Sequence, residues 1–268
     1  MVKLPIRFLI ILLVLAVGAA APVSGGEASP TGQSAVSAGA HIRPLRAGYE
    51  FPRQSLRYEA EYHFVTAGVA TLKVEREGNQ EHVVGNADST GVTALLFRVQ
   101  DRLNSYFDAQ SLCSNRLTKH TEEGSHARET NITFDYKIRK AVLQEKNLKT
   151  GQTKRTENDI PNCVADIVSG VFYVSSLPLD KDATYDIPLN DGGKTVTIRA
   201  HVEGREQVKT PAGTFAAIRI GPEGDYSALK NRGRVLIWYS DDARHLPVQM
   251  QARLWWGTLT VYLAGIDK

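Results

Sequence analysis

The chain has 268 residues, of which 42% are hydrophobic, 23% charged and 8% aromatic, with 22 Gly and 11 Pro. These proportions are ordinary for a globular protein and exclude collagen, a coiled coil and general disorder. The formal net charge of +3 is too small for a nucleic-acid-binding protein, which normally carries a dense basic surface. Two cysteines are too few for a cysteine-rich scaffold or a four-thiolate metal site.

The N-terminus has the charge and hydropathy order of a secretory signal peptide. Lys3 and Arg7 precede an apolar run over residues 8–17, and small residues follow as far as Ala21. We therefore predict a signal peptide over residues 1–21, cleaved after Ala21; an uncleaved N-terminal anchor is the alternative. The apolar run is short for a span of about 30 Å of hydrocarbon. Cleavage would lower the net charge from +3 to +1, because it removes two basic residues and no acidic one.

Residues 22–50 are dominated by Gly, Pro, Ser and Ala and contain one aromatic residue. Such a segment buries too little apolar area to offset the entropy lost on ordering. We predict a flexible leader over residues 22–50 and a single β-rich domain over residues 51–268, which is a usual size for one large β domain.

Apolar and polar residues alternate along most of this domain, beginning at Leu56, which is typical of half-buried strands. Turn-forming residues such as Gly78, Gly124 and Asp191-Gly192 separate the alternating runs. The predicted strands are Leu56–Phe64, Val69–Val74, Glu81–Asp88, Leu103–Phe107, Arg116–Glu122, Glu129–Tyr136, Lys140–Asn147, Thr184–Pro188, Lys194–Glu203, Glu206–Thr210, Phe215–Pro222, Arg234–Tyr239, Val248–Trp255 and Gly257–Leu263. We expect a mainly β fold: one large, twisted antiparallel sheet that forms a half-barrel or a barrel.

One segment has helical periodicity instead. Apolar residues recur at helical spacing from Val164 to Phe172, Asn162 can cap the start, and Leu177-Pro178 ends the run. We predict one amphipathic helix, from Val164 to about Ser176, that lies across a sheet face or closes one end of a barrel.

In an exported chain, Cys113 and Cys163 most simply form a disulfide. The bond would connect the start of the helix to the sheet. The alternative is a redox or nucleophilic cysteine, since a helix N-terminus lowers the pKa of a thiol. No CxxC spacing supports that alternative.

Catalytic and cofactor motifs are not recognisable in this sequence. Gly193-Lys194-Thr195 lacks the first glycine of a phosphate-binding loop, because Pro188 stands there, and no GxSxG elbow occurs. No two of the seven histidines share a helical or strand face by spacing. We therefore expect no catalytic residues, no cofactor and no metal, although a site assembled through space stays open.

Two features allow a binding role. Seven basic residues and one acidic residue lie between Lys137 and Arg155, so Lys137, Arg139 and Lys140 could contact an anionic lipid or polysaccharide; a solvated strand edge protected by lysines is the alternative. Trp255 and Trp256 end the two faces of one strand, and Trp238 precedes them. With Phe172 they could line an apolar cleft, and an ordinary core is the alternative.

With these elements placed, the domain resembles an exported bacterial family, domain of unknown function 3108 (DUF3108), over about residues 55–265. The segments that carry the resemblance are Asp101–Asp108, Pro161–Ile167 with Phe172-Tyr173, Val208–Phe215, and Ile237–Asp242 with Leu246–Val248. The resemblance implies a β protein that is periplasmic or associated with the outer membrane, without established catalytic residues. Family members often have a basic residue after the aromatic pair, where this chain has Val174-Ser175.

By looser analogy, a curved antiparallel sheet with a helix across its mouth looks like the half-barrels that carry lipoproteins or lipids across the periplasm. The first functional hypothesis is therefore a periplasmic, non-enzymatic binding or carrier protein for an apolar or lipid-like ligand. The second is an envelope scaffold or assembly factor that binds protein or polysaccharide, and the third is a hydrolase. Nucleic acid is not an expected partner, and after signal cleavage the chain would be at most peripheral to a membrane.

Overall fold

A computed structural model describes residues 49–223, 234–254 and 257–267. The predicted signal peptide, nearly all of the predicted leader, and Trp255 and Trp256 lie outside these ranges. Within them, no helix has the length and hydrophobicity needed to cross a membrane.

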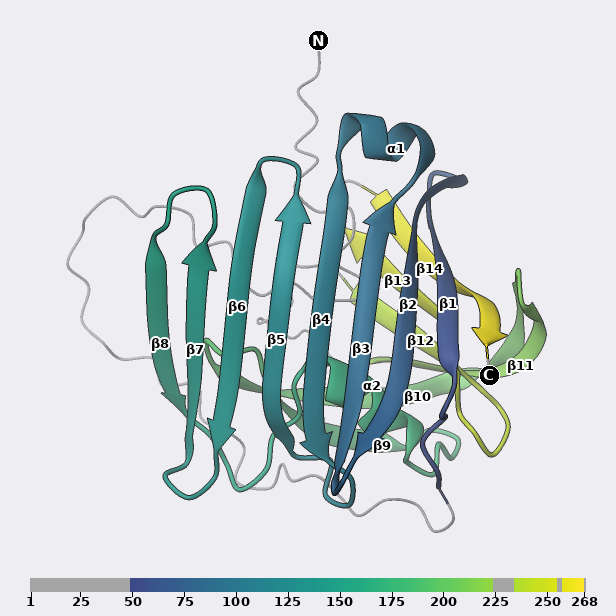
Figure 1. The fold of residues 1–268 in the computed structure, drawn as a ribbon. Coiled ribbons are helices and arrows are strands. Elements are labelled where there is room, and N and C mark those ends of the chain that lie inside the picture. The colour runs from purple at the N-terminus through teal and green to yellow at the C-terminus, as the bar shows by residue number, and fades with distance from the viewer. Residues whose placement is uncertain (1–48, 224–233, 255–256, 268) are drawn as a thin grey trace.

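The described chain forms fourteen strands and two helices (Figure 1). The strands are β1 (Ser55–Tyr62), β2 (Val65–Glu77), β3 (Gln80–Ser89), β4 (Val99–Asp108), β5 (Ser114–Glu123), β6 (His126–Asp135), β7 (Lys140–Asn147), β8 (Thr153–Asp159), β9 (Thr184–Asn190), β10 (Thr195–Thr210), β11 (Gly213–Pro222), β12 (Arg234–Ser240), β13 (Pro247–Leu254) and β14 (Gly257–Asp267). The helices are α1 (Gly91–Leu96) and α2 (Ile167–Ser175).

All fourteen strands belong to one antiparallel sheet in the order β8-β7-β6-β5-β4-β3-β2-β1-β14-β13-β12-β11-β10-β9. The first strand therefore lies in the middle of the sheet, and the chain winds outward from it in both directions. Strands β1 to β8 form one layer, the C-terminal strands cross behind it, and α2 lies near the crossing (Figure 1). The prediction of a large antiparallel sheet is confirmed, and the sheet is an open half-barrel, because β8 and β9 do not pair as strands.

The two sheet edges meet through side chains. The Nδ2 of Asn190 on β9 donates to Oδ1 of Asn158 on β8 at 2.7 Å, and the Nδ2 of Asn158 donates to the carbonyl of Gly192 at 3.0 Å. Gly192 has a positive φ of 89°, and a Cβ there would lie 2.8 Å from the side chains of Ile132 and Leu143. Glycine thus lets the β9–β10 turn pack against the inner face of β6 and β7.

Three elements differ from the sequence prediction. Strand β8 was not predicted, because this edge strand is polar on both faces and shows no alternation of apolar residues. The predicted strands Lys194–Glu203 and Glu206–Thr210 are one strand, β10, with a register shift between Val202 and Gly204. Helix α1 was also not predicted, because it has only six residues and none of them is buried.

Helix α2 begins at Ile167 with Asp166 as its N-cap, so the predicted start at Val164 and the cap at Asn162 are wrong. The preceding backbone is extended because it bonds to the sheet. The amide of Ser114 donates to the carbonyl of Val164, and Ala165 forms a parallel bridge with Leu189 on β9. Asn162 instead accepts a hydrogen bond from Arg139.

The core lies between the layers and extends slightly beyond the predicted domain boundary. Phe51 packs against Phe107 and Phe172, with ring centroids 5.8 and 6.3 Å apart. Tyr49, which the prediction assigned to the leader, is buried, and its hydroxyl forms a hydrogen bond with Ser175 on α2. The folded unit therefore includes Tyr49, because α2 supplies a partner for its polar end.

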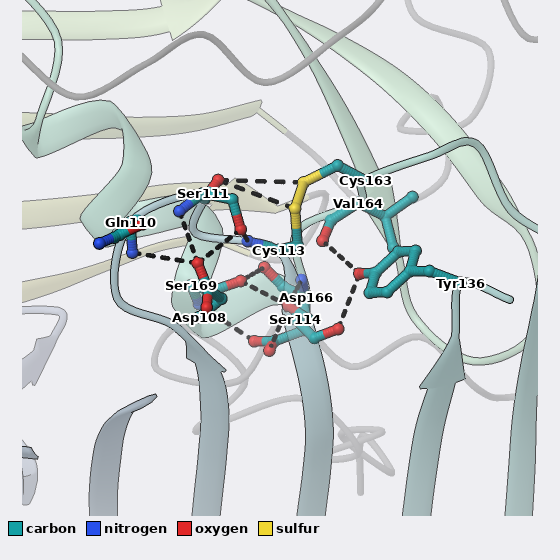
Figure 2. The surroundings of a disulfide bond; sticks show 10 residues. All are labelled: Asp108, Gln110, Ser111, Cys113, Ser114, Tyr136, Cys163, Val164, Asp166 and Ser169. Atoms are coloured by element: carbon teal, nitrogen blue, oxygen red, sulfur yellow. Dashed lines mark hydrogen bonds between the residues drawn. A yellow bond between two sulfur atoms is a disulfide. The ribbon is translucent and has the colours of Figure 1, made fainter. Parts of the chain in front are cut away.

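Cys113 and Cys163 form a disulfide with Cα atoms 5.1 Å apart, as predicted (Figure 2). Cys113 precedes β5 and Cys163 lies three residues before Asp166, so the bond connects the segment leading into α2 to the sheet. Neither cysteine is free, so neither offers a nucleophilic thiol while the bond is formed.

Replacing both cysteines, as Cys113→Ser with Cys163→Ser, should lower the free energy of unfolding by about 4 kcal/mol, because the cross-link closes a long loop of the unfolded chain. Urea unfolding of the oxidised wild type and the double variant measures this difference. A loss below about 1 kcal/mol would show that the bond does not restrict the unfolded chain in this way.

Candidate functional site

An apolar pocket of about 170 Å³ lies between α2 and the sheet layer formed by β9 to β12. Most of its lining is aliphatic, and the polar residues at its rim belong to the end of β9 and the turn that follows. The lining residues are Ile167, Gly170, Val171, Val174, Ile187, Leu189, Asn190, Asp191, Lys194, Val196, Ile198, Ala200, Ile220, Gly221, Pro222, Val235, Ile237 and Tyr239.

The sequence produces this pocket through two periodicities. Ile167, Gly170, Val171 and Val174 fall at i, i+3, i+4 and i+7, so they share one face of α2. Side chains two residues apart on each facing strand point to the same side, which places one aliphatic row per strand opposite the helix. Gly170 lets α2 approach β9 closely, since a Cβ there would lie 2.8 Å from a methyl group of Leu189.

The N-terminus of α2 is fixed by a buried carboxylate, Asp166 (Figure 2). Its Oδ1 accepts the amides of Val168 and Ser169 at 2.7 and 3.1 Å, which caps the helix. Its Oδ2 accepts the hydroxyls of Ser105 on β4 and Ser114 on β5, both at 2.8 Å. Burial raises the pKa of Asp166, and these hydrogen bonds oppose that rise. Both carboxylate oxygens are thus used to hold α2 on β4 and β5.

The structure does not bring the predicted ligand-binding residues together at this pocket. Phe172 is fully buried on the face of α2 that packs against Phe51 and Phe107. Trp238 alternates with the pocket residues Ile237 and Tyr239, so it lies on the other side of β12. Its Nε1 donates to Glu206 at 2.7 Å. Trp255 and Trp256 lie outside the described residues.

The pocket residues were missed because the signal used in the sequence was aromatic content, whereas the pocket is mainly aliphatic. The available signal was the helical spacing of Ile167, Gly170, Val171 and Val174, which leaves a second apolar face on α2 beside the one that contains Phe172.

The basic residues predicted to contact an anionic surface lie at the β6–β7 turn. The Nζ of Lys140 is 2.8 Å from Oδ1 of Asp159 and 3.8 Å from a carboxylate oxygen of Glu157, both on β8. Arg139 donates to Asn162. These contacts connect the turn to β8 and to the segment before α2. An anionic partner for this turn stays a prediction.

A second polar group, which the sequence did not reveal, lies on the inner face of β4 to β7. Asp101, Lys119 and Glu145 share strand faces with the core residues Leu103, Leu117 and Leu143, respectively. Burial lowers the pKa of Lys119, and Asp191 of the β9–β10 turn opposes that change. The inner face of this layer is therefore apolar at one end and charged at the other.

Glu75, Glu77 and His82 are the three residues of the described chain that gather donor atoms at a distance suited to a cation. Each is engaged by the protein itself. The Nδ1 of His82 lies 2.8 Å from Glu77 and its Nε2 lies 3.0 Å from Oδ1 of Asn104, and Glu75 pairs with Lys73. These hydrogen bonds and ion pairs within the protein account for the cluster. The absence of a metal stays a prediction.

Asp101 should make stability depend on pH. Burial raises its pKa to about 7 from an ordinary value of 3.8, and the nearby Glu123 adds to the rise. Between these values the folded protein keeps a proton that the unfolded chain has released, so the free energy of unfolding falls as the pH rises. The loss of unfolding free energy that ionised Asp101 causes is complete above about pH 7 and absent below about pH 4.

Asp101→Asn, which keeps an acceptor for the Glu122 amide, should therefore stabilise the protein at about pH 8, by up to about 4 kcal/mol, and have little effect at about pH 4. Urea unfolding at both pH values measures the difference, with Asp180→Asn as a control for the same charge change on the surface. An equal effect of Asp101→Asn at the two pH values would contradict the assignment.

Solved structures are similar to this chain at low sequence identity, and the first of them shares its fold. A β-barrel-like protein of domain of unknown function DUF1849 from Brucella abortus has a TM-score of 0.55 and 10% identity, over 82% of this chain and 98% of that chain. A candidate exported protein with a YmcC-like fold from Bacteroides fragilis has a TM-score of 0.35 and 8% identity, over 85% and 100%. A candidate lipoprotein from Parabacteroides distasonis has a TM-score of 0.30 and 11% identity, over 81% and 97%.

No curated protein matches the sequence significantly. A family model described as protein of unknown function (DUF3108) matches residues 57–264, which is nearly the whole β domain. Strands β2 to β13, the helix α2 and the segments that carry the resemblance in the sequence fall within this match, as do most of β1 and β14. The chain belongs to the DUF3108 family.

Proposed function

We propose that this protein is a non-enzymatic binding or carrier protein of the cell envelope, and that it holds an apolar or lipid-like ligand in the pocket between α2 and β9 to β12. The observation that carries the proposal is the pocket itself, which combines a mostly aliphatic lining with a few polar groups at one rim. This combination is typical of sites for apolar small molecules.

The size of the pocket suits part of a lipid. An apolar cavity of about 150 Å³ can hold a molecule as large as benzene. A pocket of about 170 Å³ therefore accommodates one ring or a short stretch of an acyl chain. Asp191 and Lys194 lie in the turn at one end of the lining, where Lys194 is exposed, so the polar end of such a ligand would face solvent there.

An envelope location is supported by the predicted signal peptide and by the disulfide. Disulfides persist in oxidising compartments such as the bacterial periplasm and are rare in the cytosol. The bond between Cys113 and Cys163 also helps to hold α2, which forms one wall of the pocket.

Filling the pocket should weaken binding of an apolar probe. Val171 is half-buried and lines the pocket from α2, so a larger side chain there occupies ligand volume with limited effect on the core. Titration with dansyl-undecanoic acid, followed by fluorescence, should show binding to the wild type and about a tenfold weaker affinity for Val171→Trp.

Val142→Trp is the matched control, since Val142 is a half-buried valine on β7 that does not line the pocket. Circular dichroism and thermal unfolding establish that both variants are folded. Equal affinity of Val171→Trp and the wild type, or no binding to the wild type, would exclude this pocket as the site.

A further inference from the structure

Exposed apolar side chains gather at one end of the sheet. Of the eight large hydrophobic residues that the described chain exposes, seven lie at the end that carries α1 and the β1–β2 turn, and Ile138 lies at the other. We call six of the seven the apolar rim: Phe64, Val65, Val92, Leu95, Leu96 and Leu148. Figure 1 shows α1 and the β1–β2 connection side by side at the top of the sheet.

Backbone hydrogen bonds connect the parts of this rim. The amide of Thr90, just before α1, donates to Ala67 on β2 at 3.1 Å. The amide of Gly124, in the β5–β6 turn, donates to Arg98 just after α1 at 2.8 Å, and the amide of Leu148 donates to Ala127 at 2.9 Å. These turns and α1 therefore form one edge of the sheet, and the polar β5–β6 turn separates Leu148 from the other rim residues.

Phe64 occupies a position that fold stability does not favour. His63 and Phe64 form a two-residue hairpin turn closed by Tyr62 and Val65, and both turn residues have a positive φ, 48° and 64°. Turns of this kind prefer Asn-Gly, and a bulky residue with positive φ is strained. The Phe64 side chain is 100% exposed, so packing against the described part of the chain does not offset the strain.

Helix α1 is similarly unexplained by packing. Val92, Leu95 and Leu96 lie at i, i+3 and i+4 on one face and are all exposed, with Leu95 at 86%. None of the residues of α1 is buried. The segment is held at its end by Phe97, which lies so close to Gly124 that a Cβ there would be 2.6 Å from its ring. The chain thus fixes an apolar helix face and directs it outward.

The charge around the rim is suited to an anionic surface. The segments 62–72, 90–98 and 146–154 contain Arg98, Lys146, Lys149 and Lys154 and no acidic residue. Arg98 and Lys149 are exposed, and Arg98 donates to the neutral Gln100. Acidic residues lie at the adjacent β5–β6 turn, where Glu122 pairs with His120 and Glu123 is half-buried, and at Glu61, which precedes the β1–β2 turn.

We propose that the apolar rim inserts into the interfacial region of a phospholipid bilayer that contains anionic lipid. A few large apolar side chains on protruding turns, with basic residues beside them, are the chemistry by which proteins bind to a bilayer without crossing it. A bilayer also accepts side chains from separate turns without a matching surface. The proposal is independent of the apolar pocket, because no rim residue lines it.

Flotation with vesicles tests the proposal on the protein purified from the envelope of producing cells, with its N-terminus determined by mass spectrometry. All variants then share whatever N-terminal segment the exported protein keeps. Vesicles of phosphatidylcholine alone and of equal parts phosphatidylcholine and phosphatidylglycerol are compared. Wild-type protein should float with both kinds and more strongly with the anionic vesicles.

The variant Phe64→Asn should bind vesicles more weakly while its thermal stability stays equal or rises, since Asn tolerates a positive φ. Adding Leu95→Gln and Leu96→Gln should reduce partitioning by about tenfold or more. Arg98→Glu with Lys149→Glu should reduce binding to anionic vesicles only. Ile138→Asn, which removes the exposed isoleucine at the opposite end, is the matched control and should bind as the wild type does.

Three results would overturn the proposal: failure of the wild type to float with vesicles, equal flotation of the rim variants and the wild type, and equal losses for the rim variants and Ile138→Asn. A fourth contrary result is loss of self-association in sedimentation velocity with no change in vesicle binding, which would identify the rim as a contact between copies. Failure of the pocket to bind an acyl probe would leave the expected flotation results unchanged.

Discussion

The Asp166 carboxylate joins α2 to the strands beneath it, and the pocket depends on this contact. The side chain is fully buried, and its oxygens accept two backbone amides of α2 and two serine hydroxyls from β4 and β5. A buried carboxylate without hydrogen-bond partners would strongly destabilise the fold. Because Asp166 finds these partners only when α2 lies on β4 and β5, the need to hydrogen-bond this carboxylate fixes the position of the helix. The disulfide between Cys113 and Cys163 restricts the segment leading into α2.

This anchoring leaves α2 with two different apolar faces. Phe172 and its neighbours pack into the core with Phe51 and Phe107. The face that contains Val171 faces β9 to β12 and lines the pocket. Strands β8 and β9 do not pair, and side-chain hydrogen bonds such as those between Asn158 and Asn190 connect them instead. The sheet therefore does not close over this space. An open half-barrel with a fixed helix is thus a scaffold for a cavity that a closed, filled barrel would lack.

Much of the fold could be predicted from the sequence because alternation and turn residues report directly on antiparallel strands. The pairing of Cys113 with Cys163 followed from the number of cysteines and the exported character of the chain. Strand β8 could not be predicted, because this exposed edge strand has no apolar face and therefore no alternation of apolar and polar residues. The start of α2 was misplaced because Ala165 bonds to β9, a contact between distant parts of the chain that local periodicity does not encode.

The site was less predictable than the fold. The sequence favours Trp238 as a ligand-binding residue, yet its indole donates to Glu206 on the side of β12 away from the pocket. The orientation of β12 in the sheet decides which of its side chains face the pocket. The residues that line the pocket are ordinary aliphatic residues, whose role depends on which face the sheet turns inward. Likewise, Phe64 and Leu95 look like core residues in the sequence, and the structure places both in solvent. Burial is a property of the assembled sheet, which hydrophobicity alone does not give.

If the pocket beside α2 holds an apolar ligand in the cell, the purified protein should carry that ligand. Native mass spectrometry of the protein, purified without detergent from the envelope of producing cells, detects it. We expect a bound species of defined mass that is released on denaturation, is extracted into organic solvent, and is absent from Val171→Trp. A wild-type protein that carries no such species, or a species bound equally by Val171→Trp, would contradict this expectation.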